Sequence, residues 1–200
     1  MAKVKLDILE STCVPLPFEN VDTDQIIPAR FLSATSRQGF GDNLFRDWRY
    51  TKNGEKNSEF VLNNPDYTGK VLVAGKNFGS GSSREHAVWA IFDYGFRAVV
   101  SSFFADIFMN NALNNGLLPI VISDDLLKKL HDLVQNDPRT RVKIDLEKQT
   151  FTILSTGDSM KFAINPYKKE CLLKGLDDID FLLSMKSTIT SFENNKSLLK

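Results

Sequence analysis

Short apolar runs alternate with helical patterns between residues 70 and 135, and this alternation constrains the fold more than any other feature. Apolar runs at residues 70–74, 97–101 and 117–122 predict buried strands. Amphipathic patterns predict the helices that follow these strands, at residues 83–94, 104–115 and 123–135. Strands that alternate with helices are typical of a parallel sheet covered by helices. We therefore predict an α/β fold with a parallel core.

The regions around this core are less regular. Residues 36–69 are polar and rich in turn formers, so we expect an irregular excursion with a turn at Asn53-Gly54. Additional strands are predicted at 141–145, 150–154 and 160–164, followed by a helix at 169–184. We expect a single domain over residues 1–185 and a flexible tail over residues 186–200.

Charge and cysteine content exclude several classes of protein. The chain has 25 Lys and Arg against 25 Asp and Glu, so no global charge attracts it to nucleic acid or to an anionic membrane. We find no signal peptide and no apolar run long enough to span a bilayer, and we expect a cytoplasmic protein. Cys13 and Cys171 are too few for the usual iron–sulfur ligand set, so we expect no metal or cofactor in this chain.

A glycine-rich loop, Gly75–Gly81, lies between a predicted strand and a predicted helix. Backbone N–H groups and a helix N-terminus at such a place favour anions. Three nucleotide or hydrolase patterns are absent: no Gly-Lys-Ser/Thr, no Gly-x-Ser-x-Gly, and Arg84 where Gly-x-Gly-x-x-Gly needs its last glycine. The guanidinium of Arg84 matches a carboxylate, which predicts a small carboxylic acid as ligand and leaves phosphate open.

The same residues also have structural interpretations. Ser82 and Glu85 fit a capping box, with Ser82 as N-cap, and we interpret Glu85 and His86 as structural. Arg84 would oppose the helix dipole in the first turn, which favours a role toward a ligand. We interpret His131 as a surface residue of a polar helix. Three phenylalanines are interpreted as core: Phe103, Phe104 and Phe108.

Two blocks of the sequence resemble known proteins. The segment from Gly79 to Ile120 resembles the swivelling-domain core of aconitase-type hydro-lyases, whose hallmark is a Gly-x-Gly-Ser-Ser-Arg-Glu loop. The ending Asn115-Gly116-Leu117-Leu118-Pro119 belongs to the same pattern. The block Asn20–Leu32 looks like the N-terminal motif of the isopropylmalate dehydratase small-subunit family. The resemblance covers about residues 1–185 and implies an aconitase-like swivelling β/β/α domain of the bacterial type.

The resemblance implies a hydro-lyase that interconverts 2-isopropylmalate and 3-isopropylmalate through 2-isopropylmaleate in leucine biosynthesis. A chain of this length resembles the separate small subunit, active only with a large subunit that carries a [4Fe–4S] cluster, in a heterodimer or heterotetramer. Two alternatives stay open. One is a related substrate: homoaconitate, citraconate or methylmalate, or dimethylmalate. The other is a non-catalytic phosphate- or nucleotide-binding module.

Site residues follow from the resemblance position by position. Ser82 matches the catalytic base, Asp24 matches a catalytic aspartate in a Thr-Asp motif, and Arg84 matches a ligand of the substrate carboxylate. Arg30 is assigned to a second carboxylate. Three more residues complete the predicted substrate site: Thr23, Gly81 and Ser83. We interpret Asp22 as a turn residue that starts a short helix, while Phe31 and Leu32 line either the isopropyl pocket or the core.

Serine is a weak base, and this has a consequence for the predicted mechanism. Lowering the pKa of a serine hydroxyl by about six units requires about 8 kcal/mol. A helix N-terminus contributes ~2 kcal/mol at most. Loop amides, the charge of Arg84 and the partner's site must supply the remainder. We therefore expect the isolated chain to be inactive.

Overall fold

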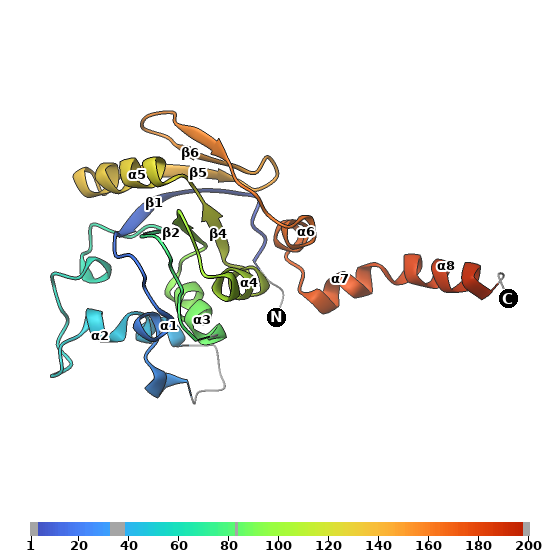
Figure 1. Ribbon diagram of the computed structural model, residues 1–200, viewed down its shortest axis with the longest axis horizontal. Coiled ribbons are helices and arrows are strands. Elements are labelled where there is room, and N and C mark those ends of the chain that lie inside the picture. Colours follow the sequence, from blue (N-terminus) through green and yellow to red (C-terminus); the bar gives the residue numbers. More distant parts are fainter. Residues whose placement is uncertain (1–3, 33–38, 83, 198–200) are drawn as a thin grey trace.

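The computed structural model describes residues 4–32, 39–82 and 84–197, and within these ranges the strands form one seven-stranded sheet (Figure 1). The strand order is β4-β3-β2-β1-β5-β6-β7. The strands are β1 (Ile8–Leu16), β2 (Val71–Ala74), β3 (Ala98–Ser101), β4 (Leu118–Val121), β5 (Arg141–Asp145), β6 (Thr150–Ile153) and β7 (Ser159–Lys161). The strands predicted between residues 70 and 122 and the hairpin near 141–154 are confirmed.

Strand β1 joins a parallel half-sheet to an antiparallel one. Its second half, Cys13–Leu16, pairs in parallel with β2, which continues in parallel to β3 and β4. Its first half, Ile8–Thr12, pairs antiparallel with β5, which continues to β6 and β7. The sequence analysis placed no strand here, because Ile8–Leu16 mixes polar and apolar residues. Its central place comes from pairing on both sides.

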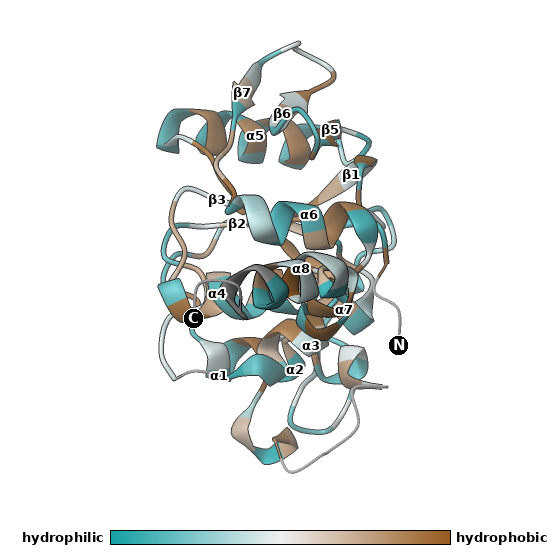
Figure 2. Cartoon of the chain, turned by 90° about the vertical axis from the view of Figure 1, so that its right-hand side faces the viewer, coloured by the Kyte–Doolittle hydropathy of each residue, from teal (hydrophilic) through white to brown (hydrophobic). Residues whose placement is uncertain are grey.

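Helices cover both faces of the parallel half. The helices are α1 (Thr23–Ile26), α2 (Arg46–Arg49), α3 (Glu85–Tyr94), α4 (Asp106–Asn114), α5 (Asp124–Asn136), α6 (Pro166–Lys174), α7 (Asp178–Ser184) and α8 (Lys186–Ser197). Short 3₁₀ turns are η1 (Ala29–Phe31), η2 (Phe40–Asn43) and η3 (Val61–Asn63). Figure 2 shows α5 at one end of the molecule with β5–β7, and α1–α3 at the other.

Two hydrophobic cores, one on each face of the parallel strands, hold this arrangement. Alternate residues of β2 point to opposite faces, so Leu72 joins one core and Val71 and Val73 join the other. The first core includes Ile91 of α3, and the second includes Leu130 of α5. A strand buried on both faces explains why residues 70–74 read as a continuous apolar run.

The start of α3 corrects a prediction. The helix begins at Glu85 with Arg84 at the N-cap, and no side chain caps it. The predicted capping box from Ser82 to Glu85 is therefore wrong, and Arg84 is not a first-turn residue. Gly81, at φ +89°, turns the chain before the helix can begin. Ser83 lies outside the described residues.

Other expectations near the surface also change. The predicted helix 169–184 divides at Gly175, whose φ of +69° ends α6 before α7 begins. Phe103 is half exposed instead of buried, whereas Phe104 and Phe108 are core. His131 is buried in α5, so its assignment to the surface is wrong. Residues 186–197 form helix α8, which projects with α7 away from the body (Figure 1), and the flexibility of residues 186–200 stays a prediction.

Candidate active site

The loop between β2 and α3 is bound to the N-terminal segment by backbone hydrogen bonds. The amides of Gly79 and Ser80 donate to the Val21 carbonyl, at 2.8 and 3.2 Å. The Thr23 amide donates back to the Ser80 carbonyl at 2.9 Å. These bonds bring together the two motif blocks, which lie about 60 residues apart in the sequence. The loop geometry therefore depends on both blocks.

Two glycines of this loop have positive φ angles for different reasons. At Gly79 (φ +79°) an added Cβ would lie 2.3 Å from Cγ of Phe108, so the core leaves no room for a side chain. At Gly81 (φ +89°) an added Cβ would lie 3.5 Å from Cβ of Asp22, an ordinary contact. Gly81 is therefore required for its backbone angle, and Gly79 is required for space as well.

Helix α1 presents Asp24 beside the loop. The Asp22 carboxylate accepts the Gln25 amide, and the Gln25 side chain accepts the Asp22 amide, both at 2.8 Å. This capping box confirms Asp22 as the residue that starts a short helix. Because the cap fixes the first turn, the Asp24 carboxylate lies on its outer side with 54% of the side chain exposed.

Arg84 and Asp24 form an ion pair that closes the loop against α1. Nη1 of Arg84 donates to Oδ1 of Asp24. The arginine side chain is only 16% exposed. The Thr23 hydroxyl donates to the Ser82 carbonyl at 2.9 Å, and Ser82 itself is exposed. The structure thus brings four predicted site residues, Thr23, Asp24, Ser82 and Arg84, to one place at the surface.

Arg30 is bound elsewhere. Its Nη1 donates to Oδ2 of Asp47 at 3.0 Å, and its Nη2 donates to the other carboxylate oxygen. This pairing lowers the pKa of Asp47 and raises that of Arg30. The two residues line a hollow of about 680 Å³ to which the β2–α3 loop contributes no residue. Phe31 lines the same hollow, and both Phe31 and Leu32 also pack against the core.

A polar contact behind the loop fixes the start of α3. The Asn115 side chain donates to the Glu85 carboxylate at 2.9 Å and accepts from Nε1 of Trp89 at 3.1 Å. The His86 ring packs against the Trp89 ring, with centroids 4.5 Å apart. These contacts support the structural interpretation of Glu85 and His86. Asn115 received no role from the sequence, although it begins the Asn-Gly-Leu-Leu-Pro ending quoted above.

Potential metal-binding side chains are dispersed over the described part of the chain. It contains no group of three His, Cys, Asp or Glu side chains placed to bind a metal ion. Cys13 and Cys171 are both free and buried, and burial raises the pKa of the Cys13 thiol to about 12. No helix in the described ranges is long and apolar enough to cross a membrane.

Comparisons with known proteins agree over nearly the whole chain. Residues 3–125 match the family described as Aconitase C-terminal domain. The 3-isopropylmalate dehydratase small subunit of Azobacteroides pseudotrichonymphae is 61% identical, covering 96% of this chain and 98% of its own length. That of Cytophaga hutchinsonii is 56% identical, covering 98% and 97%. A solved 3-isopropylmalate dehydratase structure from Methanocaldococcus jannaschii has 30% identity and a TM-score of 0.67, covering 92% of this chain and 98% of that one.

Proposed function

The chain belongs to the family of 3-isopropylmalate dehydratase small subunits, and from this premise we propose that the β2–α3 loop and α1 form its half of the active site. As a hydro-lyase subunit of leucine biosynthesis it works with a large subunit. The observation that carries the proposal is the convergence of Asp24, Ser82 and Arg84 at one exposed edge, from two distant blocks.

The proposed reaction interconverts 2-isopropylmalate and 3-isopropylmalate through 2-isopropylmaleate. Dehydration removes a proton from a carbon next to a carboxylate and removes hydroxide from the neighbouring carbon. Rehydration adds them back in the opposite positions. The reaction therefore needs a base at the carbon and a fixed cation at the carboxylate.

Each side chain of the site has a role in this proposal. Arg84 binds a substrate carboxylate with its guanidinium, in place of the Asp24 carboxylate that it holds in the free chain. Ser82 removes the proton. The Thr23 hydroxyl donates to the Ser82 carbonyl and so fixes the backbone of Ser82, whose own hydroxyl faces the substrate. We also assign Gly81 and Ser83 to substrate binding, and Arg30 binds the second carboxylate after it leaves Asp47.

Because α3 begins later than predicted, its N-terminus helps less to ionise Ser82, and other groups must supply more of the required free energy. The helix begins three residues beyond Ser82, so its N-terminus contributes less than the ~2 kcal/mol available at a cap. Ionising a serine near neutral pH requires about 8 kcal/mol. Ser82 is exposed in this chain, where water screens the charge of Arg84. The partner must therefore exclude water, and the isolated chain is inactive.

We propose that the large subunit holds the [4Fe–4S] cluster, since the described residues of this chain offer no ligand set for one. A cluster bound there supplies a Lewis acid for the substrate hydroxyl. The two subunits form a heterodimer or heterotetramer, and we place the complex in the cytoplasm, which suits two free thiols.

Reconstitution tests this proposal. The chain is mixed with a cluster-loaded large subunit and assayed with 2-isopropylmalate and, separately, with the hydroxy diacids of the alternative enzymes. We expect the highest kcat/KM for 2-isopropylmalate and no turnover by either subunit alone. Turnover by the isolated chain would contradict the shared site, and a higher kcat/KM for another diacid would change the substrate. Tight ATP binding by an inactive mixture would favour the nucleotide-binding module.

The role of Ser82 has a matched control in the same loop. Ser82→Ala should lower kcat by roughly 10²–10⁴-fold, the usual contribution of a general base, while KM changes little. Ser80→Ala removes a hydroxyl two residues away whose contact, to the Asn20 carbonyl at 3.5 Å, is weak, so its kcat should stay near wild type. Full activity of the Ser82→Ala variant would show that Ser82 is not the base.

A further inference from the structure

A second hollow, of about 440 Å³, lies at the carboxyl ends of the parallel strands on the side of α5. All four parallel strands contribute to it through the residues that follow them: Pro17 and Glu19 after β1, Gly75 and Lys76 after β2, Ser102 after β3, and Asp124 after β4. Sheets of this type bind ligands at the carboxyl ends of their strands. Gly75 and Lys76 are the first residues of the β2–α3 loop, but none of the residues given a role in the proposed active site lines this hollow.

Two polar side chains on the wall of this hollow are buried without a hydrogen-bond partner. His131 of α5 is 9% exposed, and neither of its ring nitrogens has a partner. The Ser102 hydroxyl is also buried and has no hydrogen-bond partner. The Ala74 carbonyl and the Asp124 carboxylate lie near these groups, but not in hydrogen-bond geometry. Leaving a buried polar group unpaired costs about 1–3 kcal/mol, which a bound polar ligand would recover.

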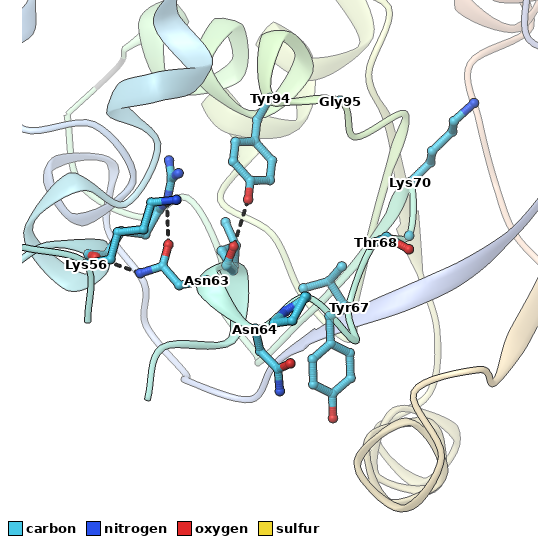
Figure 3. A pocket seen from close by; sticks show the side chains of 13 residues that line it. Lys56, Asn63, Asn64, Tyr67, Thr68, Lys70, Tyr94 and Gly95 are labelled. Atoms are coloured by element: carbon cyan, nitrogen blue, oxygen red, sulfur yellow. Dashed lines mark hydrogen bonds between the residues drawn. The ribbon is translucent and has the colours of Figure 1, made fainter. Parts of the chain in front are cut away.

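These three atoms are the only buried side-chain nitrogens or oxygens without a partner in the described ranges. Another hollow, of about 450 Å³, shows the contrast (Figure 3). There the side-chain amide of Asn63 donates to the backbone carbonyl of Arg49 at 2.7 Å, and the Tyr94 hydroxyl donates to the backbone carbonyl of Leu62 at 2.9 Å. Among the described residues, no buried side-chain nitrogen or oxygen of this hollow lacks a partner, so it gives no comparable reason to bind a polar ligand.

The rim of the α5 hollow carries charges of both signs. Lys76 and Asp124 form an ion pair across it at 3.4 Å, with both side chains more than half exposed. The other charged lining residues are Glu19, Lys128 and Asp132. A dianion would meet three carboxylates, and a dication would meet two ammonium groups. A zwitterion can bind between Lys76 and Asp124, because its carboxylate can pair with the lysine and its ammonium group can pair with the aspartate.

We propose that this hollow binds a free α-amino acid whose side chain carries an amide or a hydroxyl. The ligand carboxylate binds the exposed Lys76 ammonium on the rim. The ligand ammonium binds Asp124, and the ligand side chain reaches His131 and Ser102. Burial lowers the pKa of His131, so the neutral ring offers one donor and one acceptor.

The two histidines of the chain provide the test. Imidazole NMR signals of the full-length chain would report His131 and His86 separately, and a His131→Phe variant assigns them. Titration with L-glutamine should shift the His131 signals saturably and leave those of His86 unchanged. Glutaramate, which is glutamine without its ammonium group, and L-leucine, which lacks a polar side chain, should bind at least about tenfold more weakly. No saturable shift with glutamine, or equal binding of glutaramate or leucine, overturns the proposal.

Variants of exposed residues avoid loss of the fold. Lys76→Ala should weaken glutamine binding by about tenfold or more, because the ligand carboxylate loses a charged partner. Lys129→Ala is the matched control, since this lysine of α5 pairs with Asp158 at 2.6 Å and does not line the hollow. Glutamine binding by Lys76→Ala as tight as by Lys129→Ala would contradict the proposed position of the carboxylate.

Discussion

At the scale of single residues, the Arg84–Asp24 ion pair has consequences for substrate binding. Arg84 is largely covered, so its guanidinium is held in place before a substrate arrives. If Arg84 binds a substrate carboxylate as proposed, that carboxylate displaces or shares the Asp24 carboxylate. The free chain would then exchange one ion pair for another on binding instead of leaving a charge unpaired.

Arg84→Lys tests how much of this depends on the shape of the guanidinium. Lysine keeps the positive charge but loses the planar fork that matches a carboxylate. In the reconstituted enzyme we expect KM to rise by about tenfold or more, equivalent to ~1.4 kcal/mol. Arg139→Lys, at an exposed arginine whose partner is Asp137, serves as the control. Equal KM values for the two variants would argue against carboxylate binding by Arg84.

Arg30 and Asp47 can be separated by a pair of variants. If Arg30 binds the second substrate carboxylate, Arg30→Ala raises KM, whereas Asp47→Ala frees the arginine and leaves KM equal or lower. A purely structural pair predicts the same small loss of stability for both variants and no effect on KM. Steady-state kinetics with thermal denaturation of each variant distinguish the two cases.

At the scale of elements, the β2–α3 loop combines backbone geometry with core packing. Its amides bind the segment before α1, and its Gly79 lies directly on Phe108 of α4. The ring of Phe108 also packs edge-on against Phe78, with centroids 5.2 Å apart. The loop that carries Ser82 is thus anchored on the core at one end and on α1 at the other.

Gly79→Ala should destabilise the chain more than an alanine at another glycine with the same backbone angle. Both Gly79 and Gly54 have φ near +80°, but a Cβ at Gly54 meets no atom within 4 Å. We expect Gly54→Ala to cost about 1 kcal/mol for its backbone strain. Gly79→Ala should cost about 1–3 kcal/mol more for overpacking. Denaturant unfolding measures both, and equal losses would mean that Phe108 moves aside freely.

The turn between β5 and β6 predicts a pH dependence. Asp145 is nearly buried and accepts the Lys148 amide at 2.7 Å, and this bond lowers the pKa of Asp145. Because the pKa of Asp145 is lower in the folded chain than in the unfolded chain, its carboxylate contributes to stability, and this contribution is fully present above the unfolded-state pKa of about 3.9. The contribution is lost as the pH falls through the folded-state pKa of Asp145. Asp145→Asn should therefore be less stable than wild type at pH 7, and this difference should shrink below about pH 4.

At the scale of the whole molecule, the chain has one body and a projecting pair of helices. Helices α7 and α8 extend away from the sheet (Figure 1). They carry exposed apolar side chains, including Ile179, Leu183 and Phe192. Ser82 and Asp24 of the candidate active site are likewise exposed to solvent. The body has two buried cores of its own, so we expect it to be stable without the projecting helices.

Removal of residues 186–200 tests this division. No residue of α8 whose side chain is described, 186–194, belongs to either buried core. The truncated chain should therefore unfold within about 2 °C of the full chain, a smaller change in midpoint than the loss of a core contact would cause. Thermal denaturation followed by circular dichroism measures the midpoint. A fall of several degrees would mean that α8 stabilises the body.

Local sequence was enough to predict most of the elements. The apolar runs at 70–74, 97–101 and 117–122, and the cap at Ser123, specify strands and a helix through interactions between residues close in the chain. The turn at Asn53-Gly54 was predictable for the same reason, and the Gly54 amide donates to the Thr51 carbonyl there. The motif blocks also indicated the family, which the comparisons confirm.

Tertiary structure decided what no local pattern records. Strand β1 is central only because β2 and β5 pair with it on either side, and α3 starts at Glu85 because the preceding loop is bound to Val21 and Thr23. Asp24 meets Arg84 through the same contacts, and His131 is buried by strands that precede it in the sequence. Propensity and capping act over about five residues, whereas packing and strand pairing join residues of any separation.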